Sequence, residues 1–199
     1  MKPILHPRGM LIVTTACFAA MALAVLLAGA HPADAAARDS LLRLNSPVVT
    51  ALMRVITQFG HAWVLAPATA LLLVVFPEAR ARWWVWIGMM LLAPIAESTF
   101  KALIGRPRPF DPSFGFPSGH ATAAAAFFGA VIYLAGSLRP ATRTWVRVLA
   151  GAAIVLVAAS RVMLRAHWPS DVIGGVALGL ALASAAALLS RPPHPAAHA

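Results

Sequence analysis

The chain alternates between long apolar stretches and short polar connections. The apolar stretches cover residues 10–30, 62–76, 83–100, 121–138, 145–163 and 172–190. A helix needs about 20 apolar residues to cross the roughly 30 Å hydrocarbon core of a bilayer, and this chain has room for about six such helices. The second stretch is short and is expected to extend back towards Val55. The pattern therefore predicts an all-α integral membrane bundle of about six transmembrane helices.

Composition supports a single membrane-embedded domain. Hydrophobic residues make up 60% of the chain, charged residues make up 11%, and the mean hydropathy is +0.79. These values are far from the balance of a typical soluble domain. The connections are too short to hold a separate soluble domain. We therefore expect one domain over residues 1–199, with a short disordered tail at residues 191–199.

The first apolar stretch has two interpretations. Lys2 and Arg8 precede it and Ala28-Gly29-Ala30 ends it, which is the pattern of a cleaved secretory signal. The stretch covers about 20 residues, however, whereas the apolar core of a signal has about 7 to 15. A retained helix is the favoured interpretation, and cleavage stays open.

Basic residues do not decide the orientation of the bundle. Lys and Arg favour cytoplasmic connections, but with the amino terminus inside, the 16 of them divide equally between the two sides. Topology gives a firmer result, because with six spans the third-to-fourth and fifth-to-sixth connections lie on the same face. The formal charge of +10 lies at helix ends rather than on one soluble face. It therefore favours anionic lipid headgroups as partners over nucleic acid.

Tryptophans next to basic connections are expected to lie at the opposite membrane interface. Trp83, Trp84 and Trp86 follow one such connection, and Trp145 lies in another. Tryptophan is enriched at the boundary between lipid and water. All four are therefore predicted to be interfacial anchors.

The segment Pro117-Ser118-Gly119-His120 marks the start of the fourth span. Ser118 is a favourable helix N-cap, and His120 falls in the first turn of the helix. A helix start presents unpaired N–H groups and partial positive charge, which suit a phosphate, and Gly119 lets the backbone approach a ligand closely. The segment predicts an anion site with a histidine beside it. Taken alone, it also fits an ordinary capped helix start.

A second histidine lies in the connection between the fifth and sixth spans. Ser160 and Arg161 close the fifth span, and His167 and Asp171 flank the turn into the sixth. A carboxylate that accepts the Nδ1 proton of His167 would fix the tautomer and leave Nε2 free to attack an electrophile. The alternative is that Asp171 serves only as a helix cap.

Two cations lie where the third span ends. Arg108 is able to bind two phosphate oxygens at once, while Lys101 acts as a point charge. Glu97, one turn before Lys101, is most simply its helix partner. The roles of four nearby polar residues stay open: Glu97, Arg106, Arg165 and His61.

Together these three segments resemble the signature of the type 2 phosphatidic acid phosphatase superfamily, which includes membrane lipid phosphatases, bacterial nonspecific acid phosphatases and vanadium haloperoxidases. The signature region covers residues 101–171, and every signature position is matched. The joint occurrence of the segments at this spacing is highly specific. The six-helix pattern resembles the membrane lipid-phosphatase branch.

The resemblance implies a metal-independent phosphatase that works through a phosphohistidine. It implies that His167 is the nucleophile, that Asp171 orients it, and that His120 protonates the leaving oxygen. The residues that it implies as ligands of the substrate phosphate are Lys101, Arg108, Ser118, Gly119 and Arg161. No cofactor is expected, and the chain contains no HExxH segment, paired CxxC or carboxylate cluster suited to a metal.

The location of the signature at the mouth of a helix bundle favours a substrate whose tail stays in the bilayer. The candidates are undecaprenyl pyrophosphate, phosphatidylglycerophosphate, phosphatidic acid and lipid A phosphates. The first is preferred if the site is periplasmic, as in the bacterial members that the chain resembles, because the carrier lipid is recycled on that face. We therefore expect a multi-pass protein of the bacterial inner membrane with a periplasmic active site. The sequence does not indicate an oligomeric state.

Two other classes of function stay open. A transporter or lipid-binding protein also places charges inside a bundle, but it does not need a histidine paired with an aspartate opposite a second histidine. A phosphotransferase or a haloperoxidase-like enzyme would use the same residues. Embedding in a membrane disfavours the oxidation chemistry.

Overall fold

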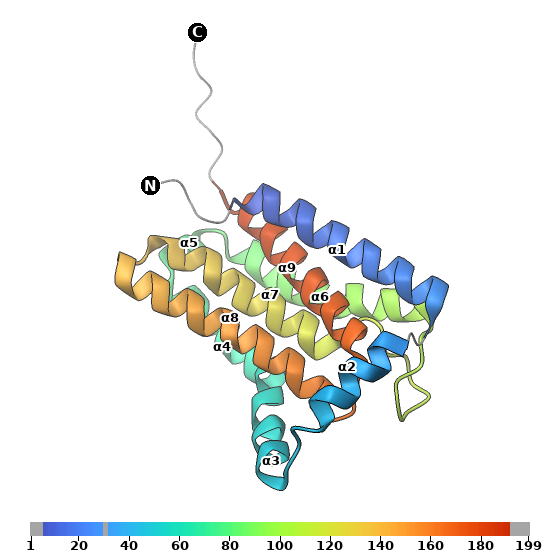
Figure 1. The fold of residues 1–199 in the computed structure, drawn as a ribbon. Helices are drawn as coiled ribbons and strands as arrows, with labels where there is room; N and C mark the ends of the chain where they lie inside the picture. The colour runs from blue at the N-terminus through green and yellow to red at the C-terminus, as the bar shows by residue number, and fades with distance from the viewer. Residues whose placement is uncertain (1–5, 30–31, 192–199) are drawn as a thin grey trace.

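The computed structural model describes residues 6–29 and 32–191 as a bundle of helices (Figure 1). The bounds of the described helices are α1 (Pro7–Ala28), α2 (Pro32–Leu42), α3 (Pro47–Ile56), η1 (Thr57–Gly60), α4 (Ala62–Val75), α5 (Pro77–Ala81), α6 (Trp83–Ile104), α7 (Gly119–Leu134), η2 (Ala135–Ser137), α8 (Pro140–Met163) and α9 (Pro169–Leu189). The two 3-10 helices carry the label η. The expected tail, apart from Arg191, lies outside the described residues.

The bundle has the predicted number of membrane-crossing segments. Within the described residues, five helices are long and apolar enough to cross a membrane: α1, α6, α7 with η2, α8 and α9. The segment from α3 through α4 passes the same test as a pair of helices bent by 51°. This confirms the all-α bundle of about six spans. The second span extends back past Val55, as expected, but with a bend of 51° between α3 with η1 and α4, which starts at Ala62.

The apolar pattern does not predict the short helix α2. Its alanines favour helix, but charged residues such as Asp34 and Arg38 interrupt any apolar stretch. In Figure 1, α2 lies across the end of the bundle where α8 ends and α9 begins, and it contacts both helices. A polar helix therefore covers the end of the bundle where the signature segments are expected.

Proline and glycine set several helix boundaries. Prolines occupy the first positions of α1, α3, α5, α8 and α9, where the missing N–H would have no partner within the helix. Pro140 starts α8 ahead of the predicted start at residue 145. Gly105 has φ 64° and ends α6 after Ile104, because glycine adopts the left-handed conformation without steric cost.

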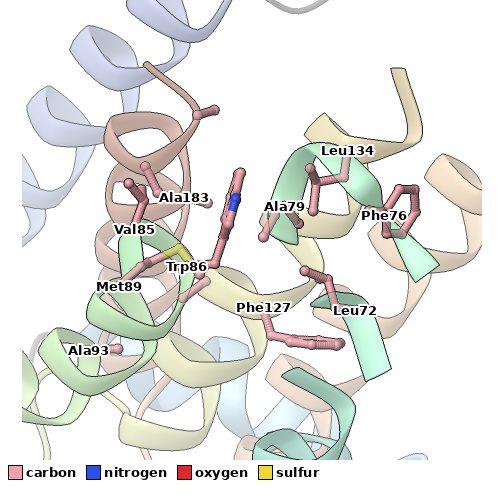
Figure 2. Packing of buried hydrophobic residues seen from close by; sticks show 14 of the residues in the cluster. Leu72, Phe76, Ala79, Val85, Trp86, Met89, Ala93, Phe127, Leu134 and Ala183 are labelled. Atoms are coloured by element: carbon pink, nitrogen blue, oxygen red, sulfur yellow. The ribbon is translucent and has the colours of Figure 1, made fainter. Parts of the chain in front are cut away.

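The largest apolar core joins α4, α5, α6, α7 and α9 around Trp86 (Figure 2). Trp86 is 2% exposed and packs in the same cluster as Leu72 and Phe127. The prediction that Trp86 is an interfacial anchor is therefore wrong. Trp83 and Trp84 have exposed side chains, as an anchor requires.

Glycines allow α7 and α9 to pack closely against each other. A Cβ added at Gly175 would lie 2.6 Å from the Ser118 carbonyl oxygen, and one added at Gly179 would clash with the Thr122 carbonyl oxygen. Real Cβ atoms do not approach backbone oxygens this closely. The start of α7, which carries Ser118 and His120, is thus held directly against α9.

We expect Gly179→Ala to destabilise the bundle by about 1–3 kcal/mol, because the added methyl group overpacks the contact between α7 and α9. Gly151→Ala is the matched control, since a Cβ at Gly151 in α8 would meet nothing within 4 Å. Thermal unfolding of both variants in detergent measures the effect. Equal stability of the two variants would contradict the close packing described here.

Candidate active site

The three signature segments meet at one end of the bundle. There α6 and α8 end, α7 and α9 begin, and the loop from Gly105 to Ser118 connects two of them (Figure 1). The Ser118 N–H donates a hydrogen bond of 2.9 Å to the backbone oxygen of Asp171. Arg106 Nη1 donates one of 2.8 Å to the Asp171 carboxylate. Segments separated along the chain therefore share one face, as the topology predicts.

Ser118 occupies the predicted N-cap position of α7, but its side chain makes no capping hydrogen bond. The hydroxyl is buried and has no hydrogen-bond partner among the described residues. The Glu97 side chain packs closely against the next residue, because a Cβ at Gly119 would lie 2.7 Å from Glu97 Oε1. The start of α7 thus offers a free hydroxyl and a helix N-terminus side by side, an arrangement that suits an anion.

His167 and Asp171 are both buried beside the turn into α9. His167 Nδ1 lies 3.4 Å from Asp171 Oδ2, which also accepts a 3.0 Å hydrogen bond from the Trp168 N–H. Asp171 therefore caps α9 and faces the imidazole at the same time, so the two interpretations of this residue do not exclude each other.

The surroundings of His167 favour its neutral form. Burial lowers the pKa of His167 below its ordinary value, and the positive charges of Arg161 and Arg108 act in the same direction. The hydrogen bond and negative charge of Asp171 raise the pKa, but the net shift is downward. A neutral imidazole is the form that has a free lone pair for attack on an electrophile.

Lys101 and Arg108 approach the site from the end of α6 and the following loop. The Lys101 ammonium pairs with the Glu97 carboxylate one turn earlier, as the sequence predicts. Arg108 Nε donates a 3.2 Å hydrogen bond to the Phe114 carbonyl oxygen. Both cations are half-buried, so their charges are partly shielded from solvent.

The positive charge of Arg161 lies near both His120 and His167. It is close enough to interact with both His120 and His167, and His120 also interacts with His167 and Lys101. Arg161 Nη1 donates a 2.9 Å hydrogen bond to Thr57 Oγ1, whereas its buried Nε has no partner in the described part of the chain. The structure therefore brings every predicted site residue to one end of the bundle.

Four further residues lie at or beside the predicted site: sequence reasoning left the roles of Arg106 and His61 open, and it missed Thr57 and Asp34. Thr57 and His61 come from η1 and the residue after it, Arg106 from the loop after α6, and Asp34 from α2. The sequence offered one signal for Asp34, which is that the chain has only six acidic residues. The structure shows that Asp34 is buried, and a buried carboxylate needs a partner. Nothing local in the sequence identifies that partner.

His61 places a third imidazole at the site. Its ring centroid lies 5.3 Å from that of His120 in an edge-to-face arrangement. Gly60 allows this approach, because a Cβ there would lie 2.8 Å from the His120 carbonyl oxygen. The bend before α4 thus carries His61 to the edge of the site.

An apolar cavity of about 580 Å³ extends from the site between α4, α6 and α7. His61, Glu97, Gly119 and His120 line the part nearest the site. Its apolar lining includes Leu65, Ala66, Leu73, Ile87, Met90 and Leu91. The cavity therefore combines a polar end with an apolar interior, which suits an amphipathic ligand.

The chain is similar to several proteins of known activity. Residues 82–192 match the model of the PAP2 superfamily. Phosphatidylglycerophosphatase B of Bacillus subtilis is 31% identical over 181 residues, which cover 83% of this chain and 87% of that protein. An undecaprenyl-diphosphatase of Sulfolobus acidocaldarius is 31% identical over 140 residues, 64% of each chain. A crystal structure of a transmembrane PAP2-type phosphatidylglycerolphosphate phosphatase from Bacillus subtilis gives a TM-score of 0.75 at 26% identity and covers 91% of this chain and 94% of that one.

Proposed function

Because the chain belongs to the PAP2 superfamily and is a membrane hydrolase of lipid phosphates, we propose that it cleaves its substrate through a phosphohistidine on His167. The observation that carries the proposal is a pair of buried donors, the Ser118 hydroxyl and Arg161 Nε, that lack partners among the described residues near two histidines. Phosphate has several acceptor oxygens and satisfies donors of this kind.

The reaction proceeds in two steps. In the first, His167 Nε2 bonds to phosphorus while the bond from phosphorus to the leaving oxygen breaks, and His120 donates a proton to that oxygen. Asp171 orients the imidazole and stabilises its positive charge. In the second, His120 accepts a proton from water, the water oxygen bonds to phosphorus, and the bond from phosphorus to nitrogen breaks. Inorganic phosphate is released and His167 returns to its neutral form.

The phosphate ligands stabilise charge as it redistributes in both steps. Their proposed contacts are to the non-bridging oxygens, and the groups involved are the side chains of Lys101, Arg108, Arg161 and Ser118 and the N–H of Gly119. Donors fixed in place before the reaction are the main source of catalysis in phosphoryl transfer. The contacts of Arg161 with Thr57 and of Lys101 with Glu97 hold two of these cations before substrate binds.

The proposed substrate is a lipid phosphate or pyrophosphate whose tail occupies the apolar cavity, with undecaprenyl pyrophosphate preferred. The polar end of the cavity at His120 and its apolar lining support such a substrate, and one relative is named an undecaprenyl-diphosphatase. His61 adds a polar group where a second phosphate would extend. Phosphatidylglycerophosphate, phosphatidic acid and lipid A phosphates are the alternative substrates, and transfer of the phosphoryl group to an alcohol is the alternative reaction.

The proposed location is the inner membrane of a bacterium, with the site on the periplasmic face. All signature segments lie at one end of the bundle, so a single topology exposes the whole site to one compartment. Recycling of the carrier lipid requires hydrolysis on that face. The loop from Gly105 to Ser118 contains Asp111. Its accessibility to protease, in sealed vesicles of known orientation, measures which face of the membrane carries the site.

A phosphate-release screen with purified protein in detergent tests the substrate. The panel contains undecaprenyl pyrophosphate, phosphatidylglycerophosphate, phosphatidic acid and lipid A, and His167→Ala protein provides the background. We expect the highest kcat/KM for undecaprenyl pyrophosphate. A higher value for another member would reassign the substrate, and absence of release from all four would contradict the proposed activity.

We expect the imidazole of His167 to titrate below pH 6.5, its ordinary value, because burial and the nearby arginines favour the neutral form and lower its pKa. The imidazole is then neutral at pH 7, as a nucleophile has to be. A pH titration of histidine ring resonances in the ligand-free protein measures the value, and His167→Ala assigns the resonance by its loss. Titration at or above pH 6.5 would contradict this account.

A further inference from the structure

Arg106 forms a buried bridge between two carboxylates at the edge of the site. Arg106 is 4% exposed. Nη1 donates a 2.8 Å hydrogen bond to Asp171 Oδ1, and Nη2 donates a 2.6 Å hydrogen bond to Asp34 Oδ2. The guanidinium group of Arg106 therefore joins the loop after α6 to the start of α9 and to the polar helix α2. These three segments lie at the same end of the bundle (Figure 1).

Asp34 is held from a second direction by the residue next to Asp171. Its Oδ1 accepts a 2.9 Å hydrogen bond from the Ser170 N–H, and its Oδ2 accepts one of 2.5 Å from the Ser170 hydroxyl. Burial raises the pKa of Asp34, but the hydrogen bonds from Ser170 and Arg106 outweigh burial and lower it overall. Asp34 is therefore ionised at neutral pH.

These contacts fix the orientation of the Asp171 carboxylate. Arg106 binds Oδ1, so Oδ2 is directed towards the Trp168 N–H and His167 Nδ1. Gly115 packs against the same carboxylate, since a Cβ there would lie 2.7 Å from Asp171 Oδ2. Without the bond to Arg106, one oxygen of Asp171 would lose its partner and the carboxylate would be able to rotate.

The second carboxylate also changes the charge that His167 experiences. Arg106 and Asp171 alone would form a neutral pair, and the negative charge of Asp171 would be largely cancelled. Adding Asp34 gives the cluster a net charge of −1, from one cation and two anions. A negative charge beside the imidazole stabilises the positive charge that it carries after attack on phosphorus.

We infer that Asp34 and Arg106 are positioning residues for phosphoryl transfer: Arg106 orients Asp171 towards His167, and Asp34 preserves the negative charge of that carboxylate. The inference rests on the proposed role of His167 as the nucleophile. It gives α2 a function in catalysis although α2 contributes no group that contacts phosphorus.

Asp34→Asn tests the inference, with Asp39→Asn as the matched control. Asp39 lies on the same helix, and its exposed carboxylate pairs only with its neighbour Arg38 among the described residues. For Asp34→Asn we expect kcat for farnesyl pyrophosphate to fall about ten- to hundredfold and KM to change less than about threefold. Asp39→Asn should leave both constants unchanged.

The titration of His167 provides a readout that a purely structural role would not change. The groups that face this imidazole are Asp171 from α9, Arg161 from α8, Arg108 from the loop and His120 from α7. None of them changes in Asp34→Asn. Removing a negative charge disfavours the protonated imidazole, so His167 should titrate at a lower pH in Asp34→Asn than in the wild-type protein.

Arg106→Gln should move the titration in the opposite direction, because it removes a positive charge near the imidazole. Loss of the buried arginine removes the guanidinium group that pairs with both carboxylates, so thermal unfolding has to show that this variant is folded. If it is not, Ser170→Ala replaces it. This variant retains all three charges, removes only the hydroxyl between Arg106 and Asp34, and should lower kcat with little shift in the titration of His167.

The outcomes separate this inference from the proposed function. Wild-type activity in Asp34→Asn, a loss of thermal stability without a loss of kcat, or an equal loss in Asp39→Asn would each overturn the positioning role. A wild-type enzyme that turns over without a phosphohistidine would instead contradict the proposed mechanism. A selective fall in kcat together with opposite titration shifts in Asp34→Asn and Arg106→Gln would support the inference.

Discussion

Replacing His167 with alanine should lower kcat by at least about 10⁴-fold, because loss of a nucleophile removes the covalent route and leaves only the contribution of the binding groups. Two measurements check this. The first is phosphate release in detergent. The second is labelling of the protein by a radioactive lipid phosphate followed by an alkaline quench, because phosphohistidine survives alkali and hydrolyses in acid. Both signals should disappear in His167→Ala.

His6→Ala is the control for this experiment. His6 is exposed and comes just before α1. Figure 1 shows that α1 begins beside the end of α9, whereas the site lies where α9 begins. Removal of the His6 side chain should leave turnover and labelling unchanged. Full activity in His167→Ala would end the assignment of the nucleophile, and labelling that persists in an inactive His167→Ala protein would place the phosphoryl group on another residue.

Replacing His120 with alanine should have an effect that depends on the leaving group. An alkoxide is a poor leaving group and needs a proton, so hydrolysis of farnesyl phosphate should slow by about 10²–10⁴-fold, the usual contribution of a general acid. Farnesyl pyrophosphate expels a phosphate, which leaves more easily, and should lose much less. The two substrates share one tail, so a comparison of their kcat values isolates the leaving group.

His61→Ala is the matched control for this second experiment, because it removes the neighbouring imidazole without altering the proposed proton donor. We expect His61→Ala to slow hydrolysis of farnesyl pyrophosphate at least as much as that of farnesyl phosphate, because its proposed contact is with the second phosphate, whereas His120→Ala should show the opposite preference. Equal losses for both substrates in His120→Ala would contradict its role as the general acid and would indicate a contribution to phosphate binding alone.

The spans and the signature segments are predictable from sequence because both depend on local patterns. An apolar run of sufficient length is a property of consecutive residues, and the signature residues lie beside helix ends that proline and glycine mark. Asp34 is different. It lies 72 positions before Arg106 and 136 before Ser170, so only the folded chain brings these partners together. Their contact depends on how α2 packs across the bundle, and no local pattern encodes that packing.

Trp86 shows a related limit. The buried residues of α6 include Trp86, Met89, Ala93 and Glu97, and their spacing of three or four positions places them on one helix face. That face is visible in the sequence. In a helix that is apolar all round, however, hydrophobicity does not tell which face meets protein and which meets lipid. Tertiary packing selects the Trp86 face.

The 3-10 helix η1 and the residue after it contact two separate parts of the site. Thr57 at the start of η1 holds Arg161, while Gly60 and His61 at its end press against His120. A shift of α3 would thus be transmitted both to Arg161, a proposed phosphate ligand, and to His120, the proposed proton donor. Substitutions along α3 should therefore alter substrate affinity and chemical rate together. The helix is largely exposed, so changes there would adjust turnover without touching a reacting group.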